Sequence, residues 1–216
     1  MTDYVPMLIA IGGLALLPFL ALMVTSFAKI VIVLGILRQA LGLQQVPPNM
    51  VLNGIALVLT LYVMAPVAMD AGDTLRSKGR GLASFKTIDD VGMMYDATAT
   101  PLRAFLLKHT NVHDRKFFIR IATRLWPEQR AQALKEDDFM VLVPAFTVSE
   151  LSEAFRIGFM IFLAFLLVDL VVANILLALG MSMVSPTIIS VPFKLLLFVM
   201  LDGWARLLQG LVLGYQ

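Results

Sequence analysis

The sequence has no cysteine among its 216 residues, which excludes disulfides and thiolate metal sites within one chain. Charged residues make up only 15% of it, and the net charge is +2, with no basic tail or arm. That balance argues against nucleic-acid binding. The sequence also lacks a nucleophile motif, a zinc-binding helix motif and a glycine-rich phosphate loop. We therefore predict a protein that is not an enzyme and binds no cofactor.

Apolar residues take the place of the missing charges. They form 59% of the chain, and the mean hydropathy of +0.86 is far above that of a soluble domain. A membrane-spanning helix needs about 20 apolar residues. Four stretches meet or approach that length, at residues 7–28, 51–69, 157–179 and 188–201, the last extending toward residue 213. The fourth is the least regular, because Pro192, Lys194 and Asp202 interrupt it.

The charges are concentrated in one segment of the chain. Of the 32 charged residues, 22 lie between Asp70 and Asp138, and only this segment has the amphipathic pattern of water-facing structure. We predict an all-α protein in three parts: an apolar hairpin at 1–69, a polar inserted domain at 70–138, and a second apolar hairpin at 139–216. Short helices are expected at 103–108 and 116–125.

Two weaker signals concern the ends of the chain and a histidine pair. The residues before the first apolar stretch include Asp3 and no positive charge, so we expect this stretch to be retained rather than cleaved as a signal peptide. Lys29 and Arg38, between the first two apolar stretches, place that connection in the cytoplasm and the inserted domain on the opposite side. His109 and His113 have a helical metal-ligand spacing, but with no second cluster we interpret them as surface residues and predict no metal site.

Several charges lie within or beside apolar stretches, where each is costly unless it is paired or faces water. Asp169 stands in the middle of an apolar run, which predicts a partner on another helix or another subunit. Thr147 and Glu150 have the spacing of a capping box, and Pro144 just upstream fits the start of a helix there.

The turn GMSMVSP, residues 180–186, raises a separate question. A turn facing water is usually polar, and a segment facing lipid must be helical to satisfy its backbone groups. This turn is neither, since it carries Met181 and Met183 between Gly180 and Pro186. From the residues alone, the two methionines are best interpreted as core residues at a helix end.

Long motifs in both halves of the chain resemble the FliP/SctR family, the export-apparatus proteins of the bacterial flagellum and of virulence type III secretion. The resemblance rests on TSFAKIVIVLGILRQALGLQQVPPNMVLNGIALVLTLYVMAPV, VLVPAFTVSELSEAFRIGF, VDLVVANILLALGM and SVPFKLLLFVMLDGW. The short N-terminus and LWPEQR look like the virulence branch. The sequence departs from the family at Ala164, where a proline is common, and at Ser182, where a methionine is common.

The resemblance implies an inner-membrane, multi-pass subunit of a protein export gate. It implies a helical ring of identical subunits, five in the family, which takes up SctS-like and SctT-like subunits, works with an SctU-like subunit and passes exported protein substrates. Much of that assembly would lie on the periplasmic side of the membrane. The apolar helices would then pack mainly against each other.

The resemblance also implies roles for individual residues. Met181, Ser182 and Met183 would form a pore gasket, with Gly180 and Pro186 as its hinge. Glu150 and Lys194 would pair across subunits, and Asp169 and Asp202 would serve helix packing in the same way. The alternative is a small-molecule or ion transporter in which Asp169 and Lys194 act on the transported ion.

Overall fold

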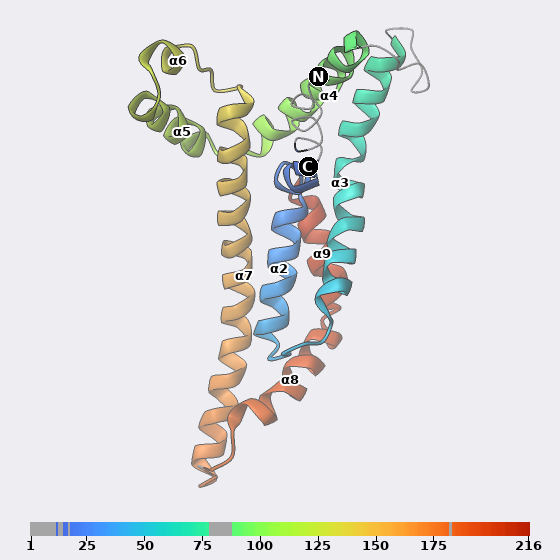
Figure 1. The fold of residues 1–216 in the computed structure, drawn as a ribbon. Coiled ribbons are helices and arrows are strands. Elements are labelled where there is room, and N and C mark those ends of the chain that lie inside the picture. The colour runs from blue at the N-terminus through green and yellow to red at the C-terminus, as the bar shows by residue number, and fades with distance from the viewer. Residues whose placement is uncertain (1–11, 13–14, 17, 78–87, 182) are drawn as a thin grey trace, which may run out of the picture. The chain divides into compact units, whose positions relative to one another are not determined.

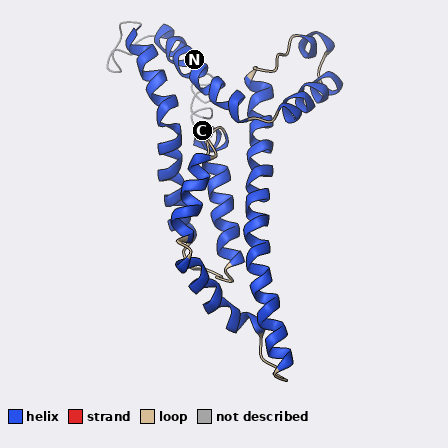
Figure 2. Ribbon diagram, turned by 180° about the vertical axis from the view of Figure 1, so that it is seen from behind, coloured by secondary structure: helices blue, strands red, loops and turns tan. Residues whose placement is uncertain are grey.

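The computed structural model describes residues 12, 15–16, 18–77, 88–181 and 183–216, and this part of the chain is helical without strands (Figures 1 and 2). The all-α prediction is confirmed for the described residues. The helices are α2 (Phe27–Ala40), α3 (Asn49–Ser77), α4 (Ile88–His109), α5 (Val112–Leu125), α6 (Glu128–Gln132), α7 (Phe139–Ala178), α8 (Pro186–Met200) and α9 (Gly203–Leu213).

The chain forms two compact units. The first unit comprises Met1–Ala28 and Met64–Glu150, and the second comprises Lys29–Val63 and Leu151–Gln216. Helices α3 and α7 belong partly to each. The three-part division predicted from the sequence differs from this one, because each long helix contributes one end to each unit, and it stays a prediction.

Two helices, α3 and α7, are long and apolar enough to cross a membrane. Helices α8 and α9 together form a third candidate, bent by 63° where they meet. Of the four predicted apolar helices, the first lies partly outside the described residues, although residues 18–23 are helical. Only 17% of the apolar window of α3 and 6% of that of α7 are buried within the chain. Lipid or other subunits must therefore cover most of this apolar surface.

Helix α7 is 40 residues long, which corresponds to about 60 Å at 1.5 Å per residue. The predicted helix start at Thr147 is wrong, because α7 is continuous from Phe139 and the Thr147 hydroxyl donates to the Val143 carbonyl inside it, at 2.9 Å. The apolar face explains the difference. It continues upstream of Thr147 through Val141, Leu142, Ala145 and Phe146, all of which are buried.

The core of the second unit joins α2, α7, α8 and α9. Leu37, Leu41 and Phe198 are buried together, with Leu43, Ile161, Phe165 and Leu207 packed around them. The Phe198 ring lies 5.4 Å from the Trp204 ring, edge to face. Gly203 is required beside it, since a Cβ there would come within 2.3 Å of the Phe198 ring. The break between α8 and α9 is therefore packed against the core.

In the first unit, α4 and α5 contain the two predicted short helices and extend beyond them. Phe105 packs against Phe146 of α7, with ring centroids 5.8 Å apart. The chain breaks at Asn111, whose side chain accepts a hydrogen bond from the His113 amide at 2.9 Å and caps α5. His109 and His113 consequently belong to different helices. His109 packs on Phe105, with ring centroids 4.7 Å apart, and is half-buried rather than a surface residue.

Candidate functional site: the α7–α8 hairpin

The turn between α7 and α8 lies at the tip of the hairpin that they form (Figure 1). Helix α7 ends in a glycine cap. Gly180 has a φ of +73°, and its amide donates to the Leu177 carbonyl at 3.0 Å, while the Met181 amide donates to the Leu176 carbonyl at 2.9 Å. This Schellman pattern satisfies carbonyls that the helix end would leave open. Gly180 therefore ends α7 and reverses the chain without a polar side chain.

Helix α8 begins with Ser185 in an extended conformation and Pro186 at its first position. Proline fits there, because its fixed φ suits a helix and its missing amide hydrogen is not needed. Between the two helices, Met183 is 99% exposed and Met181 is also exposed. The interpretation of both methionines as core residues is therefore wrong for the single chain. Ser182, the third gasket candidate, lies outside the described residues.

Further along the hairpin from this tip, a buried lysine joins three helices. The Lys194 ammonium of α8 lies 2.7 Å from Asp169 Oδ2 of α7 and donates to the Ala40 carbonyl of α2 at 3.0 Å. The Lys194 side chain is only 4% exposed, and that of Asp169 is 33% exposed. Ser190, one helical turn before Lys194, donates to the other Asp169 oxygen at 2.5 Å. Each carboxylate oxygen thus has a donor.

The Ala40 carbonyl is a favourable acceptor because it lies at the C-terminal end of α2. Gly42, with a φ of +79°, closes that end: its amide donates to the Gln39 carbonyl at 2.9 Å, and the Leu43 amide donates to the Arg38 carbonyl at 3.1 Å. The last carbonyls of a helix carry the negative end of its dipole, which a nearby cation stabilises. Lys194 is therefore bound by a full negative charge and a partial one.

This network answers where Asp169 finds its partner. The sequence left open another helix or another subunit, and the structure places the partner, Lys194, on another helix of the same chain. The two side chains can meet because Asp169 and Lys194 lie at nearly equal distances on either side of the turn between α7 and α8. The pairing of Glu150 and Lys194 between subunits stays a prediction.

Two further predicted residues lie elsewhere. Glu150 is buried in the first unit. Asp202 is exposed at the break between α8 and α9, in a left-handed conformation with a φ of 50°. Its amide donates to the Val199 carbonyl at 3.1 Å, and its carbonyl accepts from the Arg206 amide at 3.1 Å. Aspartate tolerates this backbone region better than most residues. Asp202 therefore marks the bend, and its proposed packing role is still a prediction.

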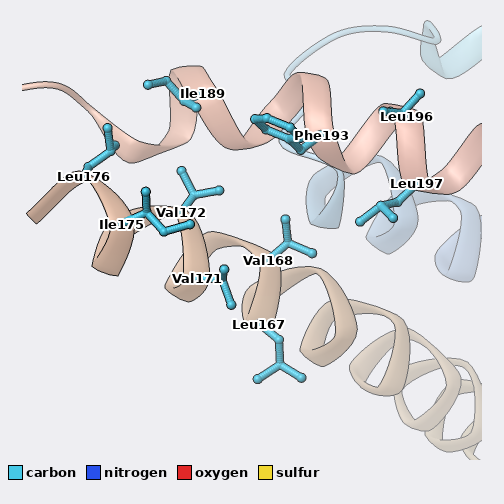
Figure 3. Close-up of a pocket in the computed structure, with 10 residues that line it drawn as sticks. All are labelled: Leu167, Val168, Val171, Val172, Ile175, Leu176, Ile189, Phe193, Leu196 and Leu197. Carbon is cyan, nitrogen blue, oxygen red and sulfur yellow. The ribbon is translucent and has the colours of Figure 1, made fainter. Parts of the chain in front are cut away.

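An apolar groove of about 650 Å³ separates α7 from α8 near the tip. Figure 3 shows Val168, Val172 and Leu176 of α7 and Ile189 and Phe193 of α8 directed toward it. The groove continues the uncovered apolar surface of α7. The hairpin thus combines an uncharged exposed tip, an apolar groove and an ion pair whose two carboxylate oxygens both accept hydrogen bonds. Sequence reasoning missed Ser190, although its spacing of four residues from Lys194 puts both on one face of α8.

Comparisons with known proteins define the class to which this architecture belongs. Residues 10–211 match the FliP family. Hypersensitivity response secretion protein HrcR of Ralstonia nicotianae is 51% identical, over 99% of this chain and 98% of that protein. Yop proteins translocation protein R of Yersinia pestis is 49% identical, over 99% and 97%. Pathogenicity-related ORF2 of Xanthomonas campestris pv. glycines is 52% identical, over 97% and 96%.

Apolar helices joined through a polar helical segment define an all-α, membrane-associated protein. Within that class, the chain belongs to the FliP family. The resemblance to the FliP/SctR family found in the sequence is confirmed.

Proposed function

We propose that the chain is a core subunit of a type III secretion export gate in the bacterial inner membrane. The observation that carries this proposal is the match over nearly the whole chain, at about half identity, to proteins named for secretion and translocation. Copies of the chain would line the channel through which unfolded proteins leave the cell. The role is structural, and other components of the apparatus would supply the energy.

The uncovered apolar surface supports an assembly rather than a channel made by one chain. Most of the apolar windows of α3 and α7 is exposed within the chain. In the proposed gate, further copies, five in total, and the SctS-like and SctT-like subunits cover this surface, with an SctU-like subunit alongside. Much of the assembly lies on the periplasmic side. Its free energy of association would come chiefly from apolar burial.

The tip of the α7–α8 hairpin is the proposed constriction. Met181, Ser182 and Met183 of each copy form a gasket around the axis, because methionine is flexible and repacks around chains of different sequence. An apolar constriction also excludes water and ions by dewetting when no substrate is present. Gly180 and Pro186 fix the two ends of this turn. The ion pair beneath it holds the two helices together while the tip adapts.

Native mass spectrometry of the detergent-extracted complex tests the proposal, with and without co-expressed SctS-like and SctT-like subunits. The expected result is a discrete homo-oligomer that takes up both partners. A monomer or dimer that ignores both partners would contradict the proposal. That result would favour a small-molecule or ion transporter, in which Asp169 and Lys194 act on the transported ion.

A further inference from the structure

Helix α5 presents two parallel rows of side chains on its outer face. The basic row consists of Lys116, Arg120 and Arg124, and the apolar row consists of Phe117, Ile121 and Leu125. Each row has a spacing of four residues, so its members lie one above another on the helix. Ile121 is half-buried, and the other five residues are exposed.

Contacts with the rest of the first unit run along the side of α5 next to the apolar row. The Asn111 amide donates to the Ser149 hydroxyl of α7 at 3.0 Å, and that hydroxyl donates to Asp114 of α5 at 2.6 Å. Arg115 lies 3.8 Å from Glu136, and Ala122 is buried. These contacts fix the rotation of α5 about its axis. They leave the basic row, and Phe117 and Leu125 of the apolar row, exposed.

The basic row has an excess of positive charge that the first unit does not neutralise. Helix α5 carries four fixed positive charges and one negative charge, and Asp114 and Arg115 are already engaged. Within the described residues, none of the three basic-row side chains forms an ion pair. A hollow of about 230 Å³ between the rows is lined by Phe117, Arg120, Ile121 and Arg124. A surface of this kind suits a partner that presents negative charges next to an apolar region.

We propose that in the unassembled subunit α5 docks on the anionic phospholipid surface of the membrane. The apolar row enters the headgroup boundary, and the basic row binds lipid phosphates beside it, as in interfacial amphipathic helices. This inference rests on the membrane placement in the proposed function. A membrane fits better than an acidic protein, because the apolar row runs along the helix beside the basic row, and the same chain has helices long and apolar enough to cross a membrane.

The experiment uses the full chain, reconstituted in nanodiscs of phosphatidylcholine with or without phosphatidylglycerol. Because the chain has no cysteine, Leu125→Cys provides a single site for an apolar fluorophore, and nitroxide-labelled lipids quench it on contact. Gln129→Cys on α6 is the control site. We expect strong quenching at residue 125 only when phosphatidylglycerol is present. Quenching should fall in about 1 M salt, where the Debye length is about 3 Å.

The charge-removal variant is Lys116→Gln, Arg120→Gln and Arg124→Gln together. Because each basic residue near an anionic membrane contributes about a fivefold preference, the docked fraction should fall about a hundredfold. The matched control removes three exposed charges elsewhere in the first unit: Arg76→Gln, Lys108→Gln and Arg130→Gln. It should leave quenching unchanged.

The outcomes separate this inference from the proposed function. A chain that does not enter nanodiscs contradicts the membrane placement, and this inference with it. A chain that enters but remains unquenched at residue 125, or is quenched equally with and without phosphatidylglycerol, contradicts only the inference. An equal loss of quenching in the two triple variants would also overturn the inference. If the natural partner of α5 is an acidic protein and not lipid, a fluorophore at residue 125 stays unquenched in both kinds of nanodisc.

Discussion

Lys194 in the second unit and Arg103 in the first both face an aspartate, but their surroundings differ. The Lys194 side chain is 4% exposed and lies 2.7 Å from Asp169, with a helix-end carbonyl as a further acceptor. Arg103 and Asp137 are 42% and 47% exposed and 3.9 Å apart, and the guanidinium also lies over the Phe139 ring at 5.1 Å. Breaking the buried pair would leave one charge without a partner and largely without water, which is costly. Breaking the exposed pair would leave a charge that water still reaches, which costs little.

The largest expected effect is at the buried pair. Lys194→Met leaves Asp169 and the Ala40 carbonyl without their cation, and should lower the free energy of unfolding by about 3–5 kcal/mol. Thermal unfolding in detergent, followed by circular dichroism, measures it. The double variant Asp169→Leu with Lys194→Met should be more stable than the single variant. If both variants are equally unstable, loss of packing rather than an uncompensated charge explains the effect.

A second test compares two glycines of α9. Gly203→Ala forces a Cβ to within 2.3 Å of the Phe198 ring, and should cost about 1–3 kcal/mol of stability through overpacking. Gly210→Ala is the matched control, because its added Cβ meets nothing within 4 Å, and alanine favours a helix by about 1 kcal/mol. The two melting temperatures should therefore shift in opposite directions. Equal shifts would contradict the packed bend between α8 and α9.

The glycine caps provide a smaller effect. Gly180→Ala places a side chain at a φ of +73° and should cost about 1–2 kcal/mol, without a steric clash. Gly42→Ala has the same backbone conflict and also approaches Val191 Cγ2 at 2.7 Å. It should be the more destabilised of the two in thermal unfolding. The reverse order would show that the tip, rather than the end of α2, is the more tightly packed.

The smallest effect is expected at the exposed pair. Asp137→Asn removes the charge opposite Arg103 but keeps the Phe139 contact, and should change the free energy of unfolding by no more than about 1 kcal/mol. Any change should shrink further in high salt, because exposed charges are screened. A loss comparable with that of Lys194→Met would abolish the contrast between the two units.

The sequence was sufficient for the all-helical class of the described residues, for two of the four predicted apolar helices, α3 and α7, and for the irregularity of the fourth apolar stretch. It also predicted that Asp169 needs a partner, but not which one. That pairing depends on the register of the α7–α8 hairpin, which the short turn at 180–185 sets. Asp169 and Lys194 lie at nearly equal distances on either side of this turn, and that symmetry is the signal by which the pair could have been found.

The helix start at Thr147 failed for a different reason. The capping-box spacing is a local pattern, whereas the buried face that extends α7 back to Phe139 depends on packing against Phe105, far away in the sequence. Tertiary packing of an apolar face outweighs a local capping signal. The same limit applies to Ser190, whose role is visible only with Asp169 opposite it.

The central claim is that the α7–α8 turn borders the path of exported proteins. A photoreactive amino acid at Met183, in the assembled complex with a stalled substrate, tests it most directly, with Tyr95 of α4 as a control position that is also exposed. We predict a covalent adduct with the substrate at residue 183 and none at residue 95. An adduct at residue 95 with none at residue 183 would contradict the claim.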